Sequence, residues 1–441
     1  MAERSRSRAD EPLGESAQRN EPSGRGFASD IADPALAEAG RTRIEWADAQ
    51  MPVLASLRER FGVQRPLEGL AVAACLHVTA ETALLMRTLV AGGAEVALCA
   101  ANPLATQDEV AAALAAEEGV EVFARHGEDF DAFAGHVADV LDRAPRITLD
   151  DGADLLVTLH AARPDLLEGL LGGTEETTSG LVRLRAMQAD DRLACAVLAV
   201  NEARAERVFN DHYGTAQSTL DGILRATNLL LAGRTVVVLG YGPTGRGIAL
   251  RARGAGAQVV VCEVDPIAGL DARMEGFDVL PSLRAAERGD IFITVTGAPA
   301  VLSAAHFERM KDGAVLANAG HFDVEIDLDA LRAAGGPGRR VRPLVEQHVL
   351  PDGRRLNLLA SGRVVNLAAG EGHPASVMDL SFALQALSVE HLALSEGKLG
   401  PGVHPVPDAI DREVARLKLA SLGVELDELT AEQRRYRRSW E

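Results

Sequence analysis

Short apolar runs alternate with segments of helical spacing along most of the chain. In the first half the runs are GLAVAACLHVT, AEVALCAAN, VEVFAR, RITLDDGADLLVTLH and LACAVLAVN. In the second half they are TVVVLG, QVVVCEVD, FDVL, DIFITVTG and AVLANAG. Buried strands that alternate with helices are typical of parallel sheets covered by helices on both faces. The sequence therefore predicts an α/β protein with two doubly wound parallel sheets.

Helical spacing also predicts where the domains meet. IEWADAQMPVLASLRERFG is predicted as a helix that ends at its glycine, and TAQSTLDGILRATNLLLAGR as a helix that leads into the second sheet. A long amphipathic helix is expected within AAGEGHPASVMDLSFALQALSVEHLAL, followed by the linker LGPGVHPVP and two terminal helices. We expect a leader at 1–29, a first domain at 30–205, a second domain at 206–369, a return helix at 370–400 and a C-terminal segment at 401–441.

Composition narrows the class of protein. The 441 residues are 47% hydrophobic, which is enough for a large core, and the net charge of −19 argues against nucleic acid or an anionic membrane as the main partner. No apolar stretch is expected to approach the ~18 residues of a membrane span. The polar leader lacks an apolar signal region, so we expect it to be disordered and the protein to be cytoplasmic. The four scattered cysteines, without metal-ligand spacing, are expected to be reduced and buried.

A glycine-rich turn supplies the first chemical signal. Gly240, Gly242 and Gly245 in LGYGPTGRG form the pattern G-x-G-x-x-G between a predicted strand and a helix. Such a turn lets the backbone approach a pyrophosphate at the helix N-terminus. Glu263 ends the next strand, where a carboxylate binds the ribose hydroxyls of the adenosine half. The sequence therefore predicts NAD, rather than NADP, as the cofactor.

Several segments, in order along the chain, resemble the S-adenosylhomocysteine hydrolase family. They include CLHVTAETALLMRTLVAGGAEV, TEETTSGLVRL, YGTAQSTLDGILRAT, GYGPTGRGIA, NAGHFDVEID and LLASGRVVNLAAGEGHPASVMD. The resemblance implies that the first domain binds substrate, the second binds NAD, and 401–441 is a C-terminal oligomerisation segment. It also implies a homotetramer with a small nucleoside substrate. It also implies a mechanism in which tightly held NAD oxidises the 3′-hydroxyl of the adenosine unit. A base then removes the C4′ proton, homocysteine leaves C5′, water adds, and the 3′-ketone is reduced again.

The resemblance assigns roles to single positions. It implies that His77 and Asp151 transfer protons near C4′ and C5′, and that Glu176 lies beside the ribose hydroxyls. With these, the candidate catalytic residues are His77, Asp151, Glu176, Glu206, Asn210 and His321. The expected substrate contacts are Thr79 and Glu81 at adenine, Asn102, Gln107, Asp211, His373 and Met378. Expected cofactor contacts beyond the glycine loop and Glu263 are Thr177, Thr178, Ser179, Thr296, Gly297, Asn318 and Asn366.

The residues alone leave structural alternatives open. A histidine after an apolar run is often a satisfied structural side chain, and His373 lies in a Gly-His-Pro stretch that is typical of a turn. Asp150 and Asp154, on either side of Asp151, are suited to helix capping. Met378 is equally well explained as core filler.

One segment departs from the family pattern. The family has V-N-D-S-x-T-K-x-K-F-D-N-x-Y-G before the NAD domain, and this chain has VNEARAERVFNDHYG. Glu206 stands where the first lysine is expected, and Asn210-Asp211 reverses an Asp-Asn pair that contacts the 2′- and 3′-hydroxyls. No nearby lysine replaces the missing one, because none precedes Lys311. The C-terminus, AEQRRYRRSWE, also lacks the Lys/Tyr tail of many family members.

Three functions remain open at this point. The first is S-adenosylhomocysteine hydrolysis with altered hydroxyl contacts. The second is a paralogue that applies the same 3′-oxidation to another adenosine-type nucleoside, with a lyase, epimerase or oxidoreductase outcome. The third is a non-catalytic NAD-binding protein. All three predict tight NAD binding.

Overall fold

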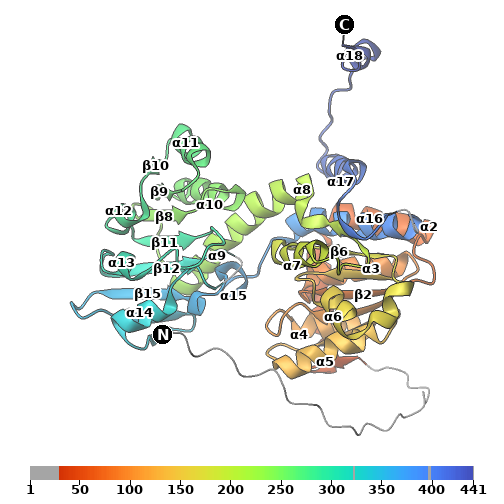
Figure 1. The fold of residues 1–441 in the computed structure, drawn as a ribbon, viewed down its shortest axis with the longest axis horizontal. Coiled ribbons are helices and arrows are strands. Elements are labelled where there is room, and N and C mark those ends of the chain that lie inside the picture. Colours follow the sequence, from red (N-terminus) through yellow and green to blue (C-terminus); the bar gives the residue numbers. More distant parts are fainter. Residues whose placement is uncertain (1–28, 321–322, 396–398, 441) are drawn as a thin grey trace.

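The chain folds into two α/β domains joined side by side (Figure 1). The computed structural model describes residues 29–320, 323–395 and 399–440. Each domain is built on its own eight-stranded sheet. The predicted fold class of two doubly wound sheets is therefore confirmed.

The first sheet is parallel throughout and has the strand order β1-β4-β3-β2-β5-β6-β7-β16. Its strands are β1 (Asp30–Ile31), β2 (Ala71–Leu76), β3 (Glu95–Ala100), β4 (Val120–Ala124), β5 (Ile147–Asp150), β6 (Gly172–Glu175), β7 (Ala196–Ala199) and β16 (Gly402–Pro405). Alternate residues of one strand belong to different cores, as Val72 and Ala74 pack on one face and Ala73 and Cys75 on the other. Both faces are buried, which explains the continuous apolar runs.

Helices cover both faces of this sheet. The helices are α1 (Ala37–Asp48), α2 (Pro52–Gln64), α3 (Ala80–Ala91), α4 (Asp108–Ala115), α5 (Phe130–Leu141), α6 (Asp154–Ala162) and α7 (Thr178–Ala189). Helices α1 to α4 contribute to one core, whereas α5, α6 and α7 contribute to the opposite one. The core of the first four also includes α16 (Ala375–Leu394), which returns from the second domain.

The second sheet has the order β10-β9-β8-β11-β12-β15-β14-β13 and is parallel from β10 to β15. Its last two pairings are antiparallel. The strands are β8 (Thr235–Leu239), β9 (Gln258–Cys262), β10 (Asp278–Val279), β11 (Ile291–Thr294), β12 (Ala314–Asn318), β13 (Arg339–Arg342), β14 (Val345–Val349) and β15 (Arg355–Leu359). The flanking helices are α9 (Ala216–Thr227), α10 (Pro243–Gly254), α11 (Pro266–Met274), α12 (Ser282–Ala286), α13 (Ala304–Phe307), α14 (Leu328–Gly335) and α15 (Val365–Ala368).

Two segments connect the domains. The first combines the short α8 (Arg204–Glu206), a π-helix at Arg207–Thr215 and α9. The second runs from α15 into α16. π-Helical turns are rare and occur frequently at functional sites.

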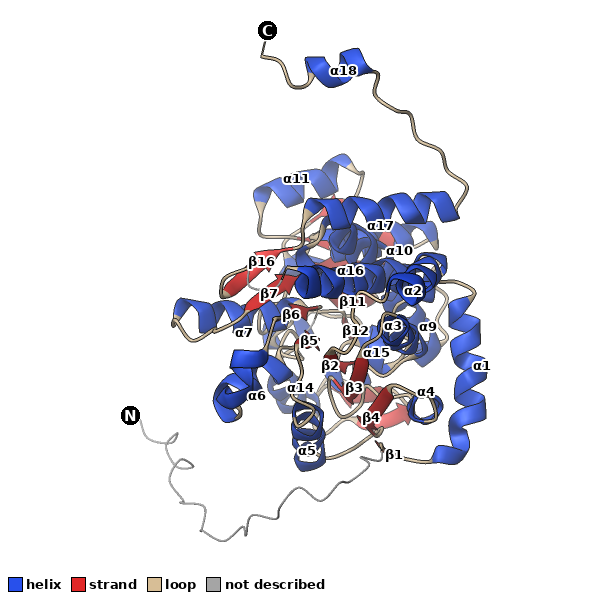
Figure 2. Cartoon of the chain, turned by 90° about the vertical axis from the view of Figure 1, so that its right-hand side faces the viewer, coloured by secondary structure: helices blue, strands red, loops and turns tan. Residues whose placement is uncertain are grey.

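Helix α16 is more deeply buried than its sequence suggested. Instead of an amphipathic helix, it is an almost fully covered one, with 13 of its 20 residues buried. It is also the one helix in the described ranges that is long and apolar enough to cross a membrane, which corrects the expectation that no such stretch exists. Because 67% of its most apolar window is buried inside the protein, it is a core helix here. Figure 2 shows it below α17 (Asp408–Ser421) and beside α2.

Two other expectations are corrected. The segment at 44–62 forms parts of two helices rather than one, because Pro52 occupies the first position of α2. Helix α2 continues past Gly62 and ends at Gln64. The next residue, Arg65, has a left-handed φ of 47°. The division at residue 401 also did not anticipate β16, which pairs with β7 in the first sheet. The terminal helices α17 and α18 (Ala431–Tyr436) follow, and α18 lies away from the body (Figure 1).

The cysteine prediction agrees with the structure. Cys75, Cys99, Cys195 and Cys262 are all buried free thiols. The leader at 1–28 lies outside the described residues, so its expected disorder stays a prediction.

Candidate functional site

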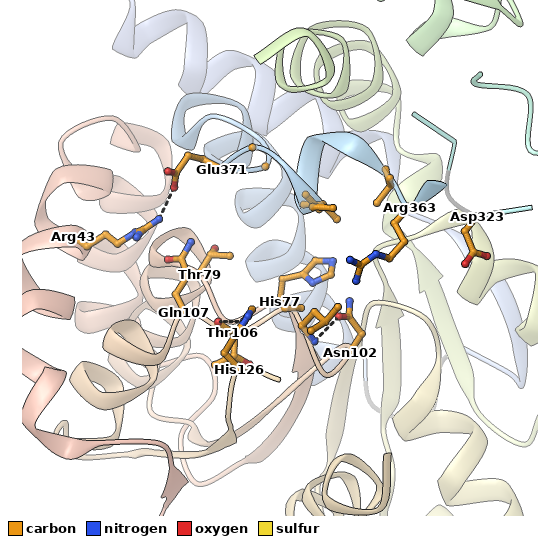
Figure 3. Close-up of a pocket in the computed structure, with 17 residues that line it drawn as sticks. Arg43, His77, Thr79, Asn102, Thr106, Gln107, His126, Asp323, Arg363 and Glu371 are labelled. Carbon is orange, nitrogen blue, oxygen red and sulfur yellow. Dashed lines mark hydrogen bonds and ion pairs between the residues drawn. The ribbon is translucent and has the colours of Figure 1, made fainter. Parts of the chain in front are cut away.

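A cavity of about 660 Å³ lies between the two domains. Its walls include His77, Thr79 and Asn102 of the first domain, and Arg363 and Glu371 near the second connection (Figure 3). His77 follows β2 directly, and Asn102 follows β3 by two residues. Ligands of open α/β sheets bind outside the carboxyl ends of the strands, which is where these side chains lie.

His77 is paired with Asp151 at this edge. The Nε2 atom of His77 lies 3.3 Å from Oδ2 of Asp151, and the two side chains are 30% and 15% exposed. Asp151 follows β5, which pairs with β2 in the sheet. The two side chains are therefore adjacent because they follow neighbouring parallel strands. An imidazole beside a carboxylate is suited to general acid–base catalysis.

His373 also lies close to this pair but is held neutral. Burial, and then the nearby His77, lower the pKa of His373 to about 4. Its Nε2 atom lies 2.9 Å from the Thr215 hydroxyl oxygen, which fixes the ring. At neutral pH His373 is therefore suited to hydrogen bonding rather than to donating a proton as an acid. His321, the third expected histidine, lies outside the described residues.

The expected substrate contacts surround the cavities on the α3 side. Thr79 caps α3, and Glu81 lies in the first turn of that helix. Glu81 lines a second cavity of about 750 Å³, which shares Gln107 and Glu371 with the first. The Oε1 atom of Gln107 is buried without a partner, so it is an acceptor available to a ligand.

Other predicted contacts have structural partners. The side chain of Asn102 accepts a hydrogen bond from the backbone of Leu104 at 3.0 Å. Met378 is partly buried and packs against the first core, which agrees with the core-filler alternative. Asp150 accepts hydrogen bonds from the backbone of Leu155 and Leu156 at 2.8 and 3.1 Å, so it stabilises the start of α6 as the capping alternative proposed.

Two more carboxyl groups, Glu176 and Glu206, lie close enough to Asp151 to be repelled by its charge. Glu176 follows β6 and is 9% exposed, while Glu206 ends α8 and is 2% exposed. Gln385 donates a hydrogen bond to Glu176, and Ser381 donates one to Glu206. Ser381 and Gln385 are four residues apart on α16, so the two carboxyl groups lie on adjacent turns of one helix face.

Glu206 is also bound by Asn210, whose side-chain amide donates to Oε1. Two of the departures from the family pattern, Glu206 and Asn210, are thus in direct contact. Burial raises the pKa of Glu206 to about 7 and that of Asp211 to about 6. Burial, followed by repulsion from Glu206, raises the pKa of Glu176 well above its usual value.

The glycine loop has the geometry that its pattern predicted. Gly240 has a φ of +106°, and a Cβ added there would lie 2.7 Å from the Val295 carbonyl oxygen. A Cβ at Gly245 would lie 2.1 Å from the Gly240 carbonyl oxygen, so this glycine allows α10 to pack against the turn. A Cβ at Gly242 would meet no atom within 4 Å, which leaves open space at the N-terminus of α10. An anion such as a pyrophosphate fits that space.

These glycines give a matched pair of predictions. Gly242→Ala should weaken NAD binding at least ~10-fold without changing apoprotein stability, since its Cβ enters only the open space. Gly245→Ala should destabilise the apoprotein by about 1–3 kcal/mol, because its Cβ clashes with backbone. Denaturant unfolding and NAD titration measure both effects. Equal losses of stability in the two variants would contradict the assignment.

Glu263 lies against the same loop. Its carboxylate accepts hydrogen bonds from the backbone nitrogens of Tyr241 at 2.6 Å and Val264 at 2.6 Å. This holds Glu263 at the carboxyl end of β9, as predicted for an acid that binds ribose hydroxyls.

The remaining cofactor candidates come from both domains. Thr177, Thr178 and Ser179 lie at the start of α7, where the Thr178 hydroxyl donates to Asn201 at 2.9 Å. Asn318 ends β12 and is fully buried, and its side-chain amide donates to the Gly362 carbonyl at 3.1 Å. The Oδ1 atom of Asn366 is buried without a partner, which suits hydrogen bonding to a ligand amide.

Sequence analysis missed Glu325, which organises the loop after β11. This fully buried carboxylate accepts hydrogen bonds from the backbone of Thr296 at 2.9 Å and of Gly297 at 2.8 Å. The backbone N–H groups of Thr296 and Gly297, two predicted cofactor residues, therefore donate to Glu325. It also missed Ser381 and Gln385, whose signal is two polar residues four positions apart in an otherwise apolar helix.

Comparisons with known proteins decide the family. The model of the S-adenosyl-L-homocysteine hydrolase family matches residues 28–166, and the model of its NAD binding domain matches residues 211–372. The chain belongs to the S-adenosyl-L-homocysteine hydrolase family. Its second domain is therefore an NAD-binding domain, and the open space at Gly242 together with the unpartnered Asn366 oxygen fits that cofactor.

Similar relatives extend over nearly the whole chain. Adenosylhomocysteinase of Aquifex aeolicus is 55% identical over 93% of this chain and 99% of its own length. S-inosyl-L-homocysteine hydrolase of Methanopyrus kandleri is also 55% identical, over 93% of this chain and 97% of its own. Adenosylhomocysteinase of Thermosynechococcus vestitus is 53% identical, over 93% and 96% respectively.

Proposed function

We propose that this protein hydrolyses S-adenosylhomocysteine to adenosine and homocysteine with tightly bound NAD. The observation that carries the proposal is the His77–Asp151 pair, which lies at a cavity between the two domains, one of them NAD-binding. Its relatives are named as hydrolases of homocysteine nucleosides. Their names favour hydrolysis over the paralogue and the non-catalytic alternatives.

The glycine loop, Glu263 and Asn366 are the groups proposed to hold the cofactor. Bound NAD supplies reversible oxidation of the 3′-hydroxyl, which makes the C4′ proton acidic enough to remove. His77 and Asp151 then move protons at C4′ and C5′. We propose this assignment because His77 lines the cavity and contacts Asp151, whereas His373 is neutral and bound to Thr215.

The nucleobase of the substrate has to be assigned separately. One relative is named for an inosyl substrate and another for an adenosyl substrate. Adenine presents an amino donor where hypoxanthine presents a carbonyl acceptor. Glu81 lines the second cavity. An ionised carboxylate accepts a hydrogen bond from the adenine amino group but repels the hypoxanthine carbonyl oxygen. We therefore expect kcat/KM to be higher for S-adenosylhomocysteine than for its inosyl analogue. A higher value for the inosyl analogue would assign the other substrate.

Glu263 is expected to select NAD over NADP, because a 2′-phosphate would meet its carboxylate. Glu263→Ser should raise the affinity for NADP relative to NAD by about 10- to 100-fold, or about 1.4–2.8 kcal/mol. Fluorescence titration of the apoprotein with both cofactors measures the ratio. Equal affinities in the unmodified protein would contradict the role of Glu263.

We also propose a homotetramer in the cytoplasm. Two features support assembly: α11 presents exposed apolar side chains, including Ile267 at 78% and Met274 at 74% exposure, and Tyr436 and Trp440 near the C-terminus are 76% and 93% exposed. Light scattering after size-exclusion chromatography measures the mass, and a monomer at micromolar concentration would contradict the proposal.

A further inference from the structure

Glu176 and Glu206 share surroundings that force them to behave differently from two independent carboxylates. Both are at least nine-tenths buried, and both bind the same face of α16. In the part of the chain that the structure describes, neither makes an ion pair with a lysine, arginine or histidine. The two carboxyl groups repel each other, and two buried like charges that interact in this way do not both stay ionised at neutral pH.

The hydrogen bonds distinguish the two groups. Glu206 accepts from Asn210 at one oxygen and from Ser381 at the other, so donors stabilise its ionised form. Among the described residues, Glu176 accepts a side-chain hydrogen bond from Gln385 alone, and its Oε1 atom is buried without a partner. An ionised oxygen without a partner costs more free energy than a neutral one, so protonation of Glu176 lowers the cost. The proton of the pair therefore belongs on Glu176.

Neighbouring carboxylates repel a negative charge on both members of the pair, so the hydrogen bonds and not the charges distinguish them. Asp151 from the loop after β5 and Asp211 from the π-helix repel a negative charge on Glu206. Glu175, at the end of β6, and Asp151 repel one on Glu176. On α16 the remaining charged neighbour, Asp379, is neutralised by Lys418 of α17. Arg207 faces Asp211 from the π-helix. With a pKa near 7, Glu206 is largely ionised at slightly alkaline pH yet readily protonated.

We propose that Glu176 and Glu206 form an unequal carboxyl pair beside the sugar, in which Glu176 stays protonated and Glu206 stores the hydroxyl proton during each catalytic cycle. The inference rests on the proposed function. When the C3′–H bond breaks, its electron pair leaves with the hydrogen to NAD and the C3′–O bond becomes a carbonyl. The O–H bond breaks at the same stage, and its proton goes to the Glu206 carboxylate. When the hydride returns to C3′ and the proton returns from Glu206 to the oxygen, the alcohol is restored and no proton is lost to solvent.

Proton counting tests the storage step. Holoenzyme is mixed with adenosine at pH 7.5 in weak buffer, while NADH absorbance and an indicator dye are followed together. We expect close to zero protons released per NADH formed. In Glu206→Gln we expect one proton per NADH, and NADH formation slower by about 10²–10⁴-fold. Release of one proton per NADH by the unmodified protein would overturn the proposal.

Infrared spectroscopy of the resting holoenzyme tests the pair without turnover. The protonated-carboxyl band at pH 7.5 should lose intensity in Glu176→Gln, and it should gain intensity when adenosine is added to the unmodified protein. An identical resting band in Glu176→Gln would overturn the assignment of the proton. This readout stays informative if S-adenosylhomocysteine is not the substrate, and absent hydrolysis would then count against the proposed function alone.

Glu202→Gln provides the matched control. Glu202 lies four residues before Glu206 but is paired at the surface with Arg185 and Arg207. Its proton count, NADH rate and infrared band should match those of the unmodified protein. A full proton released by Glu202→Gln would also overturn the assignment to Glu206.

Discussion

His77→Ala is expected to lower the rate of S-adenosylhomocysteine hydrolysis by about 10²–10⁴-fold while sparing the first oxidation. The reason is that His77 faces the cavity, where we place proton transfer at C4′ and C5′, whereas oxidation uses the sugar hydroxyl. Asp151→Asn should also lower the rate of hydrolysis, because the Asp151 carboxylate holds the His77 imidazole at 3.3 Å. Bound NADH should therefore accumulate in both variants. Stopped-flow absorbance and product chromatography measure the two steps separately.

His404→Ala is the control for this prediction. His404 lies in β16, where its Nε2 atom contacts the Gly400 carbonyl oxygen at 2.7 Å, and it does not line the cavity. Its hydrolysis rate should be unchanged. If His77→Ala lost NADH formation together with hydrolysis, His77 would instead act in binding or in the oxidation.

Lys418→Ala is expected to destabilise the protein by about 3–5 kcal/mol, because it leaves a buried carboxylate without its cation. Asp379 on α16 is fully buried, and its Oδ2 atom lies 2.8 Å from the Lys418 Nζ atom. Asp379 also accepts hydrogen bonds from the backbone of Val53 and Leu54 at the start of α2. One ion pair thus joins α2, α16 and α17. Denaturant unfolding measures the loss.

Lys311→Ala is the matched lysine control. Lys311 pairs with Asp290 at 2.9 Å, but its side chain is 44% exposed. Exposed pairs contribute at most about 1 kcal/mol. Equal losses in the two variants would show that burial of the Asp379–Lys418 pair does not determine its contribution.

Local patterns were sufficient to predict much of this molecule. The strands β2, β8 and β9 are continuous apolar runs, because helices cover both faces of their sheets. The glycine loop was predictable because Gly240 and Gly245 have backbone atoms where a Cβ would lie, and Gly242 leaves open space at the helix N-terminus. Adjacency of His77 and Asp151 followed from the positions of both residues at strand ends, although their contact depended on the pairing of β2 with β5.

Other features depend on distant contacts and left little trace in the sequence. Strand β6 reads Gly-Gly-Thr-Glu, and its glycines are required by neighbours: a Cβ at Gly173 would lie 2.5 Å from the Thr148 hydroxyl oxygen. The antiparallel β13 is wholly exposed and rich in arginine, so it lacks the buried pattern of a strand. Glu325 and the partners of Glu176 were missed because their roles arise only when separate segments meet.

Product analysis with S-adenosylhomocysteine tests the central claim most directly. Purified holoenzyme is incubated with S-adenosylhomocysteine, and mass spectrometry follows the nucleosides, the thiol and the bound cofactor. The account predicts equal amounts of adenosine and homocysteine over many turnovers, with the cofactor recovered as NAD. Absence of both products from NAD-loaded protein, or a ketonucleoside as the end product, would contradict it.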